Sequence, residues 1–154
     1  MDFIFSVLEK SRDIFKSLLE SHTLDELNTI PHGFNNNIIW NIGHIVVTQQ
    51  VLMYKLSGLP VPISETLIQK YQKGTKPEQP VTLEEVNELK SLLFTTLEQS
   101  KMDYKKSVFK TFMPYTVQTT GNALRTLEEA MQFALFHEGL HFGVVKGLSK
   151  SVKF

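Results

Sequence analysis

Four long segments of the chain contain apolar residues at helical spacing, and this pattern constrains the fold more than any other feature. Within residues 2–20, apolar side chains recur at steps of three and four and form one stripe along a helix. Similar segments span about residues 36–57, begin at Thr82, and span about residues 126–148. Almost no segment alternates with the period of two that a half-buried strand shows. Helices with one apolar face bury it against each other, so we expect an all-α, four-helix bundle.

Local signals mark where these helices begin and end. A Thr followed three residues later by Glu is typical of a capping box. The chain has three such pairs, Thr23 with Glu26, Thr82 with Glu85 and Thr126 with Glu129. The first pair predicts a short helix near residues 23–27. Gly58, with Pro60 beyond it, predicts the end of the second long helix.

Two long connections separate the helices. Residues 58–80 contain four prolines, and a short helix could form within residues 64–72. At more than about 20 residues, this connection can cross the bundle from end to end, so the second and third long helices need not be antiparallel. Residues 107–124 are rich in Thr, Phe and Tyr, and we expect a loop there with a short extended piece at residues 110–116.

The composition excludes several classes of protein. Sixteen basic and sixteen acidic residues give no net charge, which argues against a nucleic-acid partner because that binding depends on basic patches. No apolar run approaches the roughly 18 residues of a membrane span. Without any cysteine, disulfides, thiolate nucleophiles and cysteine-ligated metals are excluded. We expect one cytoplasmic domain that covers residues 1–154.

The most informative residues are His137 and His141, which lie four apart on the last predicted helix. At about 100° per residue their directions differ by only about 40°, and Ala134 and Val144 share the same face. Both imidazoles therefore point into the bundle, where burial without partners would cost several kcal/mol. A divalent metal is one partner for such a pair. The alternative is two core histidines that are hydrogen-bonded to carbonyls or tyrosines.

Residues 137–141 also match the HExxH pattern of zinc metalloproteases, with Glu138 as the general base. Such an enzyme commonly takes its third ligand from a downstream residue. Only 13 residues follow His141, and none is Asp, Glu or His. The sequence therefore disfavours a protease. We expect Glu138 to lie at the surface, with a hydrogen bond from a ligating imidazole as the alternative.

A metal site built on His137 and His141 needs a third ligand from an upstream residue. The best candidate is His44 in the second helix. Its helical row contains Asn37 and Asn41, which is unusually polar for a bundle interior. These amides either orient His44 or satisfy backbone groups at the helix end. Trp40, one turn before His44, is expected to pack in the core. A core histidine without a metal remains the alternative for His44.

Other candidate residues have weaker signals. His22 and His32 lie near expected turns and are predicted to face solvent without a chemical role. Tyr115 and Arg125 precede the last helix and are expected to be structural, with a pocket entrance as the alternative.

Two glycines, Gly139 and Gly143, lie almost opposite the histidine face of the last helix. Each glycine inside a helix costs about 1 kcal/mol relative to alanine. A ridge without side chains therefore predicts the close approach of another helix, either the first helix of the chain or a dimer partner.

Two motifs together resemble the DinB-like (DinB/YfiT) superfamily. One is Ile38-Ile39-Trp40-Asn41-Ile42-Gly43-His44, just after an asparagine run, and the other is Phe136-His137-Glu138-Gly139-Leu140-His141-Phe142-Gly143. The resemblance extends over essentially the whole chain. It implies a four-helix bundle with up-down-down-up connectivity, often a homodimer, and a divalent metal held by one histidine from the second helix and two from the fourth. In this sequence those ligands are His44, His137 and His141.

The resemblance also implies a type of chemistry. Family members with an assigned activity are metal-dependent thiol transferases or isomerases that use low-molecular-weight thiols such as bacillithiol, mycothiol or glutathione. Three histidine ligands leave at least one coordination position open, which is the catalytic pattern. We therefore expect a metal-dependent thiol S-transferase with a small-molecule substrate, and zinc or nickel as the metal before iron or manganese. The alternative is a non-catalytic helical bundle that binds a metal or a small ligand.

Overall fold

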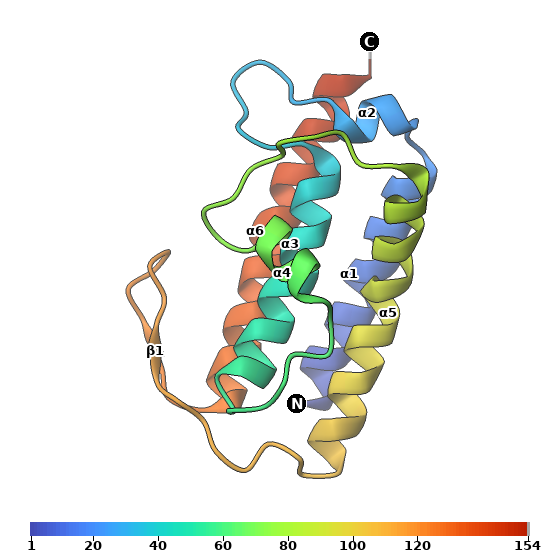
Figure 1. Ribbon diagram of the computed structural model, residues 1–154. Helices are drawn as coiled ribbons and strands as arrows, with labels where there is room; N and C mark the ends of the chain where they lie inside the picture. The colour runs from blue at the N-terminus through green and yellow to red at the C-terminus, as the bar shows by residue number, and fades with distance from the viewer. Residues whose placement is uncertain (154) are drawn as a thin grey trace.

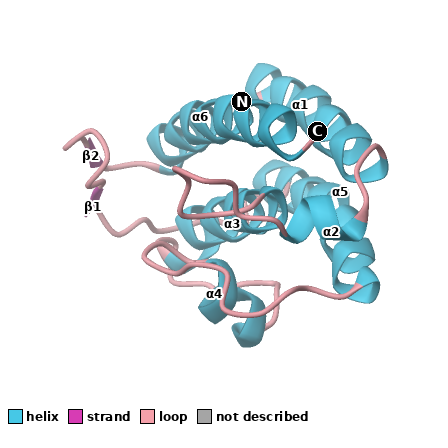
Figure 2. Cartoon of the chain, turned by 90° about the horizontal axis from the view of Figure 1, so that it is seen from above, coloured by secondary structure: helices cyan, strands magenta, loops and turns pink. Residues whose placement is uncertain are grey.

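Four long helices account for most of residues 1–153, which the computed structural model describes (Figure 1). They are α1 (Asp2–Glu20), α3 (Ile38–Gln50), α5 (Leu83–Lys105) and α6 (Leu127–Val152). Both α1 and α3 pack against α5 and against α6, so the four helices enclose a shared apolar interior (Figure 2). The predicted all-α helical bundle is therefore confirmed.

The connections explain how these helices are ordered along the chain. In Figure 1, α1 and α6 run upward, whereas α3 and α5 run downward. The short helix α2 (Leu24–Asn28) lies between α1 and α3 at the top of this view. Because α3 and α5 run in the same direction, the chain must return along the bundle between them. Residues 56–82 make this return alongside α3 and include α4 (Glu65–Tyr71), the short helix predicted within residues 64–72.

The predicted capping residues all lie at helix starts. The capping box is complete at Thr23, where Glu26 also accepts from the backbone N–H of Thr23. Thr82 and Thr126 each accept a hydrogen bond from the backbone N–H three residues later. At these two helices the glutamate does not bond to the backbone N–H of the capping threonine. Glu129 accepts from the N–H of Arg125, and Glu85 accepts from Lys70 on α4.

The second predicted helix changes its winding before it ends. After α3, residues Val51–Lys55 form the π-helical turn η1, in which the N–H of Leu56 donates to the carbonyl of Val51 at 3.4 Å. The chain then turns at Gly58, whose φ of 71° suits a glycine. The predicted helix therefore has the expected extent, but its last turn is wider. Such turns are frequent at functional sites.

A small hairpin between α5 and α6 lies beside the lower half of the bundle in Figure 1. It pairs β1 (Tyr115–Thr116) with β2 (Ala123–Leu124), with Tyr115 opposite Leu124. Gly121 lies in its turn at φ 76°. The sequence predicted only an extended piece at residues 110–116, and the second strand was missed because two residues are too few to show a period.

Burial corrects the predicted apolar stripes at a few positions. Phe3 is 79% exposed, Ile14 43% and Leu83 58%, although all three are apolar residues within the predicted helical segments. The interior side of α1 instead includes Phe5 and the charged Arg12, both at most 1% exposed. Among the described residues, none of the helices is both long enough and apolar enough to span a membrane.

Candidate metal centre

The three histidines singled out by the sequence meet between α3 and α6. One ligand atom from each of His44, His137 and His141 lies within 4.8 Å of the other two. The ring centroids are 4.5 to 5.1 Å apart. The helical spacing of His137 and His141 and the packing of α3 on α6 together produce this cluster.

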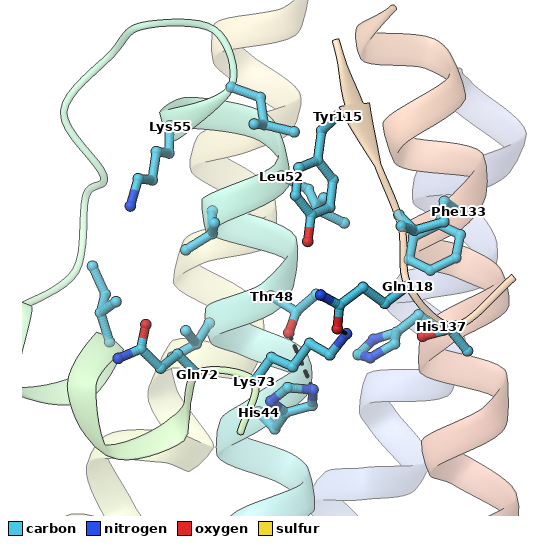
Figure 3. Close-up of a pocket in the computed structure, with 16 residues that line it drawn as sticks. His44, Thr48, Leu52, Lys55, Gln72, Lys73, Tyr115, Gln118, Phe133 and His137 are labelled. Atoms are coloured by element: carbon cyan, nitrogen blue, oxygen red, sulfur yellow. Dashed lines mark hydrogen bonds between the residues drawn. The ribbon is translucent and has the colours of Figure 1, made fainter. Parts of the chain in front are cut away.

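His44 is held by contacts on three sides. Its Nδ1 donates to the backbone carbonyl of Tyr71 at 2.6 Å, so its Nε2 is the free nitrogen. The ring of Trp40 stacks on the imidazole at 4.7 Å with an interplanar angle of 11°. The hydroxyl of Thr48 lies 3.4 Å from Nε2 (Figure 3). Trp40 is 6% exposed, as expected for a core residue, and it fixes the plane of the imidazole.

Gly43 makes room for the residue that orients His44. A Cβ at position 43 would lie 2.5 to 2.7 Å from the ring of Tyr71, which is closer than real Cβ contacts. The Tyr71 hydroxyl donates to Glu85 at 2.5 Å, and burial and this partner raise the pKa of the phenol well above its usual range. The ring is thereby fixed against α3, and its own backbone carbonyl reaches His44. The packing of Tyr71 against α3 therefore explains why a glycine precedes His44 in the sequence motif.

His141 takes its orientation from an asparagine on α3. Its Nδ1 donates to the Oδ1 of Asn41 at 2.8 Å, which leaves the lone pair of the ring on Nε2. The amide of Asn41 is fixed in turn, because its Nδ2 donates to the carbonyl of Asn37 at 2.7 Å. The side chain of Asn37 accepts from the N–H of Trp40 and caps α3. Asn41 thus orients a histidine other than the expected His44, and Asn37 satisfies the helix end.

His137 completes the cluster from one turn before His141. Its Nε2 lies 3.2 Å from the Nε2 of His141, so two ring nitrogens face each other. The ring of Phe133 stacks beside it at 6.0 Å. Nitrogens in this arrangement can share a proton or a cation.

Burial favours the neutral form of all three imidazoles. Burial lowers the pKa of His137 to about 3, assisted by the positive charge of protonated His141 and His44. Burial also lowers the pKa of His141 to about 4, and it lowers the pKa of His44. Neutral imidazole is the form that binds a metal, so the donors are ready for one without losing protons.

A cavity of about 380 Å³ opens beside His44 and His137 (Figure 3). Its walls come from α3, η1, the loop after α4, the hairpin and α6. Two lysines, Lys55 and Lys73, line it, and among the described residues that line it there is no Asp or Glu. The hydroxyl of Tyr115 points into the cavity. Tyr115 therefore lines a pocket, which was the alternative to a purely structural role. Arg125 does not line this cavity.

The expectation that Glu138 lies at the surface is wrong. It is 2% exposed, and its carboxylate pairs with the guanidinium of Arg12 at 3.3 Å and accepts from the hydroxyl of Ser11. Glu138 therefore points away from the histidine cavity and is not placed as a protease base. The sequence offered one signal for this pair: Arg12 interrupts the apolar stripe of α1 between Leu8 and Phe15.

Arg12 links all four long helices. Besides Glu138 on α6, its guanidinium donates to the carbonyl of Leu93 on α5 at 2.7 Å and to the Oε1 of Gln49 on α3 at 3.1 Å. A fully paired guanidinium of this kind fixes the register of helices that apolar contacts alone leave free to slide.

The other two histidines are separate from the centre. His32 is exposed, as predicted. The prediction that His22 faces solvent is wrong, because it is 9% exposed. Its Nδ1 lies 2.8 Å from the carbonyl of Leu18, and its Nε2 lies 2.9 Å from the hydroxyl of Ser149. His22 therefore joins the end of α1 to α6.

No helix of the described chain approaches the glycine ridge of α6. A Cβ at Gly139 or Gly143 would meet nothing within 4 Å, so the first of the two alternatives, packing of the first helix, is wrong.

Comparison with known protein families gives a match over most of the chain. A family model of the DinB superfamily matches residues 7–145, which include the three histidines. None of the curated proteins that were compared matches the chain.

Proposed function

The chain belongs to the DinB superfamily, and from this premise and the geometry of the histidines we propose that it is a metal-dependent thiol S-transferase. The proposed ligands are His44, His137 and His141. The observation that supports them most is the convergence of three neutral donors within 4.8 Å of one another. Nitrogen donors of this kind suit zinc or nickel first, and iron or manganese next.

The residues present fit a cation for a second reason. His44 and His141 both use Nδ1 for a hydrogen bond within the protein, so each keeps Nε2 for a ligand. In the described part of the chain, the cluster holds no fourth His, Cys, Asp or Glu, which leaves a coordination position for substrate. When bound there, a divalent cation supplies Lewis acidity that lowers the pKa of a coordinated thiol or water toward neutrality.

The proposed reaction transfers a thiol to an electrophilic carbon. The sulfur electron pair forms the new C–S bond, the leaving group departs with the electrons of its own bond, and the thiol proton passes to solvent. The apolar walls of the cavity, among them Val51, Leu52 and Phe133, exclude water around the electrophile. The chain has no cysteine, so the thiol must be a second substrate.

A non-catalytic metal- or ligand-binding bundle is the second candidate. The observation that favours it is the absence of any Asp or Glu among the described residues that line the cavity. A transferase without a carboxylate base depends entirely on the acidity of the thiol, whereas a binding protein needs no base.

The test combines metal content with turnover. Protein without a histidine tag is analysed for metals beside His44→Ala, His137→Ala and His141→Ala, with His32→Ala as an exposed control. We expect about one equivalent of metal in the wild type and in His32→Ala, and a loss of tenfold or more in affinity in each ligand variant. Turnover is then measured with glutathione, bacillithiol or mycothiol and chlorodinitrobenzene as the electrophile.

Thiol transfer that disappears in the ligand variants and persists in His32→Ala supports the transferase. Retained metal with no turnover over the panel supports the binding protein instead. No metal in the wild type after growth with zinc or nickel contradicts both.

We also propose that the chain forms a homodimer through α6. Phe136, Leu140 and Val144 are 41 to 48% exposed on one side of this helix, next to Gly139 and Gly143. Exposed apolar side chains beside glycines allow two helices to approach closely. Analytical ultracentrifugation should find a dimer that Leu140→Lys converts to a monomer. A monomeric wild type at micromolar concentration contradicts the proposal.

A further inference from the structure

The cavity beside the histidines has two lysines in its lining that form no ion pair within the described chain. Lys55 and Lys73 line it, and no carboxylate among the described residues does. The histidines add no negative charge, because they are neutral donors. A cation bound by them would make the cavity still more positive. A ligand that enters such a cavity gains free energy if it is an anion.

Lys73 is the cavity lysine whose charge acts on the histidines. Its side chain extends from the loop after α4 toward the hairpin, where its Nζ donates to the Oε1 of Gln118 at 2.5 Å (Figure 3). Its charge acts on both His44 and His137 and contributes to lowering their pKa values. Figure 3 shows its ammonium group near His137, between the two walls of the cavity.

The neighbouring Lys70 differs from Lys73 in its partner. Lys70 forms an ion pair with Glu85 at 2.7 Å. Within residues 1–153, Lys73 has no carboxylate at ion-pair distance and contacts only a neutral amide. Lys73 is exposed and its ammonium group is hydrogen-bonded to Gln118, so its charge stays available to a ligand.

The rest of the cavity is mostly apolar. Its aliphatic and aromatic wall consists of Val47, Val51, Leu52, Leu56, Ile68, Val117 and Phe133. With a volume of about 380 Å³, the cavity suits a small organic molecule. Inorganic anions would leave this wall in contact with water.

We propose that this cavity selects an organic anion, with a carboxylate paired to Lys73 and an apolar body against the wall of α3, η1 and Phe133. The proposal rests on the proposed function only in taking this cavity as the substrate site. It assigns Lys73 as the residue that selects a negatively charged substrate. Gln118 is assigned as the residue that positions the ammonium group of Lys73.

The test compares two probes of the same shape. Phenylbutyrate carries a carboxylate, and phenylbutanamide replaces it with a neutral amide. Binding of each to the full-length protein is measured by calorimetry and by the fluorescence of Trp40, the only tryptophan, in zinc-loaded and in chelator-treated protein. The chelator-treated protein separates pairing with Lys73 from any contact between carboxylate and metal.

Three variants complete the design. Lys73→Met removes the charge, Lys73→Arg keeps it, and Lys76→Met removes an exposed lysine of the same loop that does not line the cavity. We expect the carboxylate to bind about five- to tenfold more tightly than the amide in the wild type, Lys73→Arg and Lys76→Met, and equally to the amide in Lys73→Met. The preference should shrink at high salt.

Equal binding of both probes to the wild type overturns the proposal, as does an unchanged preference in Lys73→Met or no saturable binding of the carboxylate. A failure of the proposed function looks different. The protein would then lack metal or thiol turnover, while the charge preference of the chelator-treated protein would persist.

Discussion

At the scale of single residues, the candidate centre depends on the side chains around the histidines as much as on the histidines themselves. Tyr71 and Asn41 each accept a hydrogen bond from an Nδ1, and this selects the tautomer with a free Nε2. Without such partners an imidazole can rotate or expose the wrong nitrogen. Substitutions at these positions should therefore change metal affinity although neither residue is a proposed ligand.

Asn41→Leu removes the acceptor for His141 Nδ1 and should weaken metal binding by about 10- to 100-fold. Zinc affinity measured by competition with a chromophoric chelator checks this. Asn41→Asp keeps an oxygen at the same place and should retain more affinity than the leucine variant. Asn35→Leu, at an exposed position of the preceding loop, serves as the control. Equal affinities in the leucine and aspartate variants would show that Asn41 does not orient His141.

Two glycine-to-alanine variants should change stability in opposite directions. In Gly43→Ala the new Cβ overlaps the ring of Tyr71, and we expect the free energy of unfolding to fall by about 1–3 kcal/mol. In Gly139→Ala the Cβ meets nothing within the described chain, and helix propensity should raise the free energy of unfolding by about 0.5–1 kcal/mol.

Urea denaturation of chelator-treated protein measures both glycine variants, made in the Leu140→Lys background that is expected to be monomeric. Gly43→Ala should also weaken zinc binding, since Tyr71 and its carbonyl must move away from His44. If Gly43→Ala left the free energy of unfolding unchanged, Tyr71 would be able to shift without cost.

At the scale of elements, the position of α6 relative to the other helices determines where two of the three histidines lie. Arg12 on α1 holds Glu138 on α6 and also contacts α3 and α5. Glu138 directly precedes Gly139 and follows His137, so this buried ion pair fixes the rotation of α6 at the level of the centre. The HExxH string of this chain thus has a structural glutamate.

Arg12→Leu leaves the carboxylate of Glu138 buried without its cationic partner and should lower the free energy of unfolding by about 3–5 kcal/mol. The double variant Arg12→Leu, Glu138→Leu removes both charges and should recover part of that loss. Lys101→Ala, which breaks an ion pair with Glu9 on the surface, should change stability by less than about 1 kcal/mol. Denaturant unfolding checks all three. An Arg12→Leu effect as small as that of Lys101→Ala would remove the proposed role of Arg12.

The sequence predicted the elements better than it predicted their contacts. Helix periodicity and capping threonines located the four helices, because both signals are local. The inward direction of His137 and His141 followed from the same periodicity. The partners of the centre came from distant segments, and nothing local marks them: the Tyr71 carbonyl depends on the path of the loop around α4, and the Asn41 contact depends on the depth at which α3 packs on α6.

Two failed predictions have the same cause. Glu138 was placed at the surface as a charged residue, and His22 because it lies near an expected turn; neither prediction considered a distant partner. Glu138 is buried through its pairing with Arg12 and Ser11, and His22 through its contacts with Leu18 and Ser149. Each burial depends on a partner more than 100 residues away in sequence.

At the scale of the whole molecule, the histidines should make stability depend on pH. A histidine in the unfolded chain has a pKa of about 6.5, whereas burial lowers the pKa of His137 to about 3 and that of His141 to about 4. Between these values the unfolded chain binds more protons than the folded one. The free energy of unfolding should therefore decrease as the pH falls from about 6.5 toward 4, and should be highest above pH 6.5.

Chelator-treated protein and the double variant His137→Phe, His141→Phe are unfolded with urea at several pH values. The difference between their slopes isolates the two histidines, because the carboxylates are common to both. The wild type should lose stability more steeply in this range. Parallel slopes would show that the imidazoles are not buried as neutral groups.

The most direct test of the centre uses Trp40, the only tryptophan of the chain, whose ring stacks on His44 at 4.7 Å. Nickel is titrated into tag-free, chelator-treated protein while the tryptophan fluorescence is recorded, with His137→Ala, His141→Ala and His32→Ala in parallel. We predict quenching that saturates at one equivalent in the wild type and in His32→Ala, and no saturable quenching in the other two variants. Saturable quenching that survives in both His137→Ala and His141→Ala, or its absence from the wild type, would contradict a metal centre formed by these three histidines.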